Sequence, residues 1–170
     1  MLLLLILTVT GVQPQDPLKF VVPQGWVSRP PASTMRVAEF TLPRVTADTE
    51  DAQLAIFFFG GQGGSVQANI DRWIGQMTQP DGRSSREVAS TTTLRTQSGL
   101  KVSLVDVTGT YVAEVKPGSA QRFNKPGFRL RAAVVETARG PYFVKLTGPA
   151  ATVARWDRSF LDFLAALRLD

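Results

Sequence analysis

LAIFFFGGQGGSVQANIDRWIGQM, residues 54–77, carries the strongest structural signal in this chain. Residues 54–59 are apolar at successive positions, which is typical of a strand covered on both faces. Four glycines among residues 60–64 then predict a sharp turn. Apolar residues recur at every third or fourth position from Val66 to Met77, so we expect an amphipathic helix there, with Ser65 as its N-cap.

The segments around this stretch show strand patterns separated by turn residues. Strands are predicted at residues 20–27, where residues 23–25 break the strand, and at 35–42, 83–98, 100–112, 128–137 and 142–147. A loop is predicted at 116–127, and a second helix after Pro149, capped by Thr152. Residues 138–141 are typical of a hairpin turn. Hairpin-linked strands with separate helices indicate an α+β fold, a central antiparallel β-sheet sandwiched by helices, and not an alternating βαβ sheet.

The composition excludes several kinds of chemistry. The 170 residues favour one domain with a substantial core. The chain contains no cysteine and no histidine, which excludes thiol nucleophiles, disulfides, imidazole bases and the usual zinc and haem ligands. An enzyme would have to use carboxylates, Lys, Tyr, Ser or Thr. The sequence therefore argues against catalysis, and no cofactor or metal site is expected.

The N-terminus has the character of an export signal. Residues 1–11 contain a short apolar run that resembles the central region of a secretory signal peptide, although no Lys or Arg precedes it. The run is too short to span a bilayer, which needs about 20 apolar residues. Residues 12–19 are interpreted as a flexible spacer, and residues 20–170 as the single domain. An apolar N-terminal strand is the alternative. We expect an exported protein, periplasmic or secreted, without a transmembrane anchor.

Basic residues are in excess and unevenly placed. The net charge is +5, and residues 116–145 contain seven basic residues but only one acidic residue, Glu136. Such a region is suited to an anionic lipid, a polysaccharide or a nucleic acid. Export makes nucleic acid the least expected of these partners. The alternative is a solvated basic edge without a dedicated partner.

Five pieces of sequence share a pattern with a known family. They are FVVPQGW (20–26), MRVAEFTLP (35–43), GGQGGSVQANIDRW (60–73), GTY (109–111), and GPYFVKLTGP (140–149) followed by Thr152 and Val153. Together they resemble the PsbP-like superfamily, which includes photosystem extrinsic subunits, the nuclear-import factor Mog and exported bacterial proteins without an assigned activity. The resemblance covers residues 20–167 and is greatest to the small bacterial members.

The resemblance has implications for both fold and function. It implies an antiparallel sheet between helices, and a binding or assembly-factor role instead of catalysis. Metal sites in the photosynthetic branch use histidine, which this chain lacks. Neither those sites nor a photosystem role carries over to this sequence.

The glycine-rich turn is one candidate site. Glycines before a helix can present free N–H groups to a phosphate. The turn lacks the Lys-Ser/Thr pair of a phosphate-binding loop, and the GxGxxG register fails at Val66. Gly61, Gln62 and Gly63 remain candidates for contact with a partner or an anion. The alternative is a tight turn that needs glycine for positive φ angles.

Two further groups of residues are candidates. Arg122, Phe123, Asn124 and Lys125 form a basic, aromatic loop segment that is suited to partner contact. Asp106, Glu136 and Lys145 are charges within otherwise apolar strands. They could form a polar cluster for acid/base chemistry or cation binding. Cross-strand ion pairs or exposure at strand ends are the alternatives.

The sequence thus predicts an exported, monomeric, non-catalytic binding or assembly-factor module. Its expected partner is an envelope protein or an anionic envelope surface. One alternative is a carrier of a small apolar ligand held between sheet and helix. A hydrolase that uses Asp106 and Glu136 is a less favoured alternative, because it requires both carboxylates in one open pocket.

Overall fold

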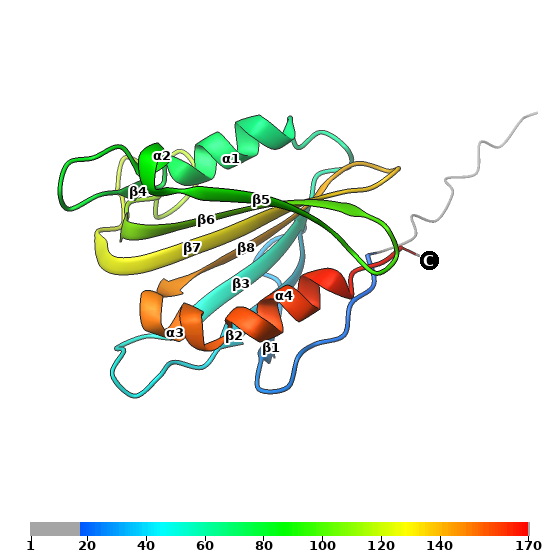
Figure 1. Ribbon diagram of the computed structural model, residues 1–170, viewed down its shortest axis with the longest axis horizontal. Helices are drawn as coiled ribbons and strands as arrows, with labels where there is room; N and C mark the ends of the chain where they lie inside the picture. The colour runs from blue at the N-terminus through cyan, green and yellow to red at the C-terminus, as the bar shows by residue number, and fades with distance from the viewer. Residues whose placement is uncertain (1–17, 170) are drawn as a thin grey trace, which may run out of the picture.

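The computed structural model describes residues 18–169, which form one eight-stranded antiparallel sheet with helices on both faces (Figure 1). The strand order is β1-β2-β3-β8-β7-β6-β4, and β5 also pairs with β6. The strands are β1 (Val27–Arg29), β2 (Arg36–Leu42), β3 (Ala52–Phe58), β4 (Met77–Thr78), β5 (Ser90–Arg95), β6 (Lys101–Tyr111), β7 (Lys125–Glu136) and β8 (Tyr142–Pro149). The predicted α+β class is confirmed.

The four helices within residues 18–169 cover the sheet unevenly. α1 (Val66–Ile74) and α2 (Ser85–Val88) lie on one side, and α3 (Ala150–Arg155) and α4 (Asp157–Ala165) lie on the other (Figure 1). Ser65 caps α1 as predicted, because its side chain accepts a hydrogen bond from the backbone N–H of Ala68. α1 packs on β6 and β7.

The two faces of the sheet differ in how far their cores extend. The core under α3 and α4 reaches from Phe40 of β2 across the sheet to Leu104 of β6. The core under α1 is centred on β6 and β7 and includes Phe143 of β8. No helix covers the α1 side of β2 and β3 in the described part of the chain. We call this uncovered region the open half of the sheet.

The open half corrects the interpretation of residues 54–59. Leu54 and Ile56 are fully buried on the α3/α4 side, as expected for a core strand. Ala55 and Phe57 point to the opposite side and are only half-buried. The strand is therefore fully covered on one face only, and not on both faces as predicted. The run of apolar residues could not show this, because it contains no information about where α1 packs.

Three other element predictions were wrong. Residues 20–26 do not form a strand, because a turn with a hydrogen bond from Trp26 N–H to the Pro23 carbonyl interrupts them. Residues 83–98 contain α2 before β5, with Ser84 as the N-cap. The C-terminal helix is divided at Trp156 into α3 and α4. In the described range, no helix is long and apolar enough to cross a membrane.

Thr152 is not a helix cap. Its hydroxyl and its backbone N–H both donate to Oδ2 of Asp48, at 2.5 and 2.9 Å, and Pro149 occupies the N-cap position. Thr152 is completely buried, so its side chain joins α3 to the loop between β2 and β3. This role depends on a residue 104 positions away and has no local sequence signal.

Of the two predicted N-terminal segments, the signal peptide and the spacer, only the last two residues of the spacer lie within the described residues. Residues 1–11, assigned to a signal peptide, and most of the spacer lie outside the described residues. Leu18 and Lys19, assigned to the spacer, are part of the packed domain. Leu18 is buried in the α3/α4-side core, and Lys19 exchanges backbone hydrogen bonds with Arg168.

The glycine turn after β3 is dictated by backbone geometry and close packing. Gly60, Gly61 and Gly64 have positive φ angles of 60°, 86° and 79°. A Cβ atom on Gly63 would overlap the ring of Phe143. The turn therefore needs glycine for structural reasons at each of these positions.

Replacing Gly63 by alanine is expected to lower the free energy of unfolding by about 2 kcal/mol, because Phe143 must move to make room. Chemical denaturation would measure the change. Gly75→Ala is the control, since its Cβ would meet only ordinary contacts and its φ is helical. Equal stability of the two variants would show that the Phe143 contact is unimportant.

Candidate functional site: a pocket on the open half of the sheet

A pocket of about 210 Å³ lies on the open half of the sheet. Its polar and aromatic lining comprises Arg36, Glu39, Gln53, Phe57, Tyr111, Lys145 and Thr147. The pairings of β2 with β3 and of β3 with β8 bring most of these residues together from distant parts of the chain, and β7 joins β8 to β6, which carries Tyr111. We call this feature the sheet-face pocket.

Lys145 is the most unusual residue of the pocket. Its Nζ donates to Gln76 Oε1 at 2.6 Å and to the Tyr111 hydroxyl at 3.0 Å. Both acceptors are neutral, and no carboxylate in residues 18–169 forms an ion pair with this amine. Burial lowers the pKa of Lys145 to about 8, and the positive charges of Arg72 and Arg36 contribute. A cation is thus held at the pocket without a counter-ion.

Tyr111 forms a wall between the pocket and the loop that precedes β7. Its ring stacks on Phe123, with centroids 5.6 Å apart, and on Phe128, with centroids 6.1 Å apart. Burial raises the pKa of Tyr111 to about 12, so its hydroxyl is neutral at physiological pH. This hydroxyl accepts from Lys145 and cannot neutralise it.

Arg36 supplies the second positive charge of the pocket. It forms an ion pair with Glu39 at 2.8 Å, and its guanidinium lies over the Phe57 ring at 5.4 Å. Glu39 also accepts a hydrogen bond from the backbone N–H of Ala32. Since Arg36 and Glu39 neutralise each other, the charge of Lys145 remains in excess.

A second pocket, of about 230 Å³, lies beside α1 and α2. The Asp71 carboxylate there is paired with Arg86 at 2.8 Å, and this hydrogen bond lowers the pKa of Asp71. The Ser85 hydroxyl donates to the Met77 carbonyl and accepts from Gln79. These polar groups already have partners, so this pocket offers no uncompensated charge.

The predicted polar cluster is not assembled. In the sheet register Asp106 pairs with Arg131 and Lys145 pairs with Ala132, so these two side chains lie on opposite faces. Glu136 is four positions along β7 from Ala132, roughly 13 Å away at ~3.3 Å per residue. It forms an exposed ion pair with Lys101 at 3.0 Å. The geometry does not support acid/base chemistry by these three residues.

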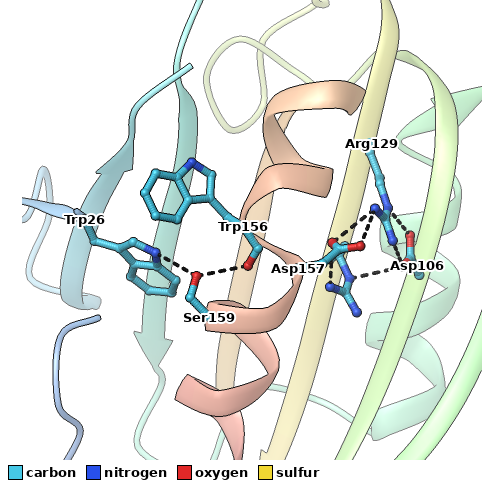
Figure 2. A network of polar contacts seen from close by, with 7 residues as sticks. Trp26, Asp106, Arg129, Trp156, Asp157 and Ser159 are labelled. Atoms are coloured by element: carbon cyan, nitrogen blue, oxygen red, sulfur yellow. Dashed lines mark hydrogen bonds and ion pairs between the residues drawn. The ribbon is translucent and has the colours of Figure 1, made fainter. Parts of the chain in front are cut away.

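Asp106 instead belongs to an ionic cluster between the sheet and α4 (Figure 2). It accepts two hydrogen bonds from Arg129, at 2.6 and 2.8 Å, and its Oδ2 lies 3.0 Å from Nε of Arg131. Both arginines also contact Asp157, the first residue of α4. Asp106, followed by Asp157, raises the pKa of Arg129 above its usual value. All four charges are thus compensated.

One atom of this cluster is imperfectly satisfied. Nε of Arg131 is buried and has no hydrogen bond, although it lies within ion-pair distance of Asp106. The distance shows electrostatic attraction, while the N–H direction fails hydrogen-bond geometry. The guanidinium also lies 5.0 Å from the centre of the Phe160 ring. These contacts indicate a structural tie that fixes α4 on the sheet.

The basic loop segment lies next to the sheet-face pocket and is largely held in place. Arg122 contacts Glu114 at 3.8 Å and donates to the Val112 carbonyl. Lys125 is the first residue of β7 and is paired with Glu50 at 2.5 Å. Asn124 is exposed, and Phe123 reaches the pocket wall through Tyr111.

Gly61, Gln62 and Gly63 lie in the turn between β3 and α1. Gly61 approaches Gly140 of the β7–β8 hairpin turn closely, and the Gln62 N–H donates to the Phe59 carbonyl. Of these three residues, none lines the sheet-face pocket.

Sequence reasoning singled out Lys145 but assigned it the wrong neighbours. It did not select Gln76, Arg36 or Glu39, which come from other segments and have no motif of their own. In the sequence, Tyr111 is distinguished only as part of the GTY pattern. The one local signal for this pocket was a lysine within the apolar strand VKL.

Comparisons with known proteins connect this fold to solved structures. No protein-family model matches the chain, and no curated protein matches it. A protein of unknown function from Pseudomonas aeruginosa, PA94, described as a candidate regulator, superposes with a TM-score of 0.52 at 13% identity, over 90% of this chain and 97% of that one.

A second solved structure is cyanobacterial PsbP (CyanoP) from Synechocystis sp. PCC 6803. Its TM-score is 0.46 at 14% identity, over 96% of this chain and 99% of the other. At these identities the likeness concerns the fold alone. The first of these structures shows that the chain is similar in fold to a bacterial protein of unknown function.

Proposed function

We propose that this protein is a non-catalytic binding or assembly module that engages its partner through the open half of its sheet. The observation that supports this most directly is the uncompensated Lys145 amine at a pocket open to solvent. A charge held without a counter-ion lowers stability, and such groups are concentrated at functional sites.

The binding surface would combine the sheet-face pocket with the adjoining basic loop. Phe123 joins the two by stacking on Tyr111. Arg122 and Asn124 are exposed beside it. A surface of this kind suits an acidic envelope protein or an anionic envelope surface, and the protein would reach it as an exported monomer. The glycine turn, four to six residues beyond Phe57, is a secondary contact in this proposal.

The two alternatives have less structural support. The sheet-face pocket and the pocket beside α1 are both lined by charged side chains, unlike an apolar-ligand cavity. Asp106 is bound by arginines and Glu136 by Lys101, so the hydrolase lacks its pair of carboxylates. Neither structural neighbour is described as an enzyme.

A photo-crosslinking amino acid in place of Ala55 tests the proposed surface. Ala55 lines the sheet-face pocket, so we expect a discrete adduct when the protein is exposed to its own envelope fraction. The matched control carries the same amino acid in place of Leu161, which is exposed on α4 across the sheet. Equal adducts from both positions, or none from position 55, would contradict the proposal.

A further inference from the structure

The Lys145 amine has an unused hydrogen-bond donor. A protonated lysine carries three N–H donors. Two of them are donated, to Gln76 and to Tyr111, and the amine forms no third hydrogen bond among residues 18–169, although it also lies 5.1 Å from the centre of the Tyr111 ring. Because Lys145 lines the sheet-face pocket, this donor is available to a molecule that enters the pocket.

The charges around Lys145 favour an anion. Arg36 of β2 and Arg72 of α1 both repel the amine electrostatically. Glu39 lines the same pocket but is occupied by Arg36 and by the Ala32 N–H. Gln76 and Tyr111, the direct partners, are neutral at physiological pH. The charged residues that line the pocket, Arg36, Glu39 and Lys145, therefore carry a net charge of +1.

The construction of the pocket suits a carboxylate better than a phosphate. Phosphate sites usually offer several backbone N–H groups from a glycine-rich turn or a helix N-terminus. The sheet-face pocket offers side chains on a sheet whose ladder hydrogen bonds occupy the backbone. The glycine turn between β3 and α1 does not line this pocket. One free ammonium donor with a single excess charge matches a monovalent anion.

We propose that the sheet-face pocket is a carboxylate-binding site in which Lys145 donates to the carboxylate and the Phe57 ring contacts the group that carries it. The volume of about 210 Å³ would hold about seven waters at ~30 Å³ each, enough for a small organic acid or one acidic side chain. This inference rests on the proposed binding function and specifies the chemistry of the ligand.

The test uses the full chain and three carboxylate probes at constant ionic strength: acetate, benzoate and an acetylated triglutamate amide. Nuclear magnetic resonance follows the Thr147 amide for affinity and the Lys145 Cε for protonation. We expect saturable binding of carboxylates, weaker binding of inorganic phosphate, and a rise in the pKa of Lys145. Above pH 8 the affinity should fall about tenfold per pH unit, because the free amine loses its proton.

Matched variants locate the site. Lys145→Met should weaken carboxylate binding at least tenfold, whereas Lys101→Met, which removes an exposed lysine at the end of β6, should leave it unchanged. Tighter binding of benzoate supports a free organic acid, and tighter binding of the peptide supports an acidic side chain of a partner. Absence of saturation, preference for phosphate, or equal effects of the two variants would overturn the inference.

The outcome is separable from that of the crosslinking experiment. If an adduct forms at position 55 but carboxylates do not bind, the proposed binding surface is supported and the carboxylate-binding inference is contradicted. If carboxylates bind but no adduct forms, the carboxylate-binding site is supported and the proposed protein partner is contradicted.

Discussion

The Asp106→Asn variant is expected to have a free energy of unfolding about 3 kcal/mol below that of the unmodified protein. The substitution keeps the shape of the side chain but removes its charge. Arg131, whose side chain is 6% exposed, would then keep only the half-exposed Asp157 as a counter-ion. Removing one partner from a buried ion pair typically costs 3–5 kcal/mol, because the remaining charge is left desolvated.

Urea denaturation measures this effect, and Asp162→Asn is its control. Asp162 is also paired with an arginine, Arg158, but both side chains are exposed, at 61% and 89%. Exposed pairs of this kind contribute about 0.5 kcal/mol or less. If the two variants were equally stable, the cluster of Figure 2 would be a solvated surface feature and not a tie between the sheet and α4.

Lys145→Met is expected to act in the opposite direction and to stabilise the protein at pH 7 by about 2 kcal/mol. Folding lowers the pKa of this amine from 10.5 to about 8, which corresponds to about 3 kcal/mol at ~1.4 kcal/mol per unit. Loss of the hydrogen bonds to Gln76 and Tyr111 offsets about 1 kcal/mol of the gain. Methionine fills a similar volume without a charge.

The stabilisation should depend on pH in a defined direction. Below pH 8 the amine is protonated in both the folded and the unfolded chain, so its full penalty is present. Between pH 8 and 10.5 the unfolded chain binds more protons, and the stability of the unmodified protein rises with pH. The gain from Lys145→Met should therefore shrink to near zero by pH 10. A gain independent of pH would contradict the lowered pKa of Lys145.

These two variants compare a compensated cluster of charges with a single uncompensated charge in the same fold. The cluster around Arg131 has four charges that compensate one another, and it holds α4. Lys145 lacks such compensation and lines a pocket. A residue that lowers stability where solvent enters is the pattern expected of a binding site.

Elements with a complete local signal were predicted correctly. The start of the helix after the glycine turn, its Ser65 cap and the hairpin between β7 and β8 each depend on residues close together in the chain, whereas the helix ends at Ile74 and not at the predicted Met77, which begins β4. The PsbP-like motifs predicted the same antiparallel sheet. Local periodicity and turn chemistry are sufficient for such features, because their hydrogen bonds join near neighbours.

The composition and periodicity of this chain were therefore enough for its fold class and for the exclusion of thiol, imidazole and haem chemistry. They were not enough to predict where each charged side chain lies in the fold. Strand register puts Asp106 and Lys145 on opposite faces, and α1 stops short of β3, so that Lys145 opens to solvent beside Tyr111. Both facts depend on contacts between residues far apart in the chain, which local patterns do not encode.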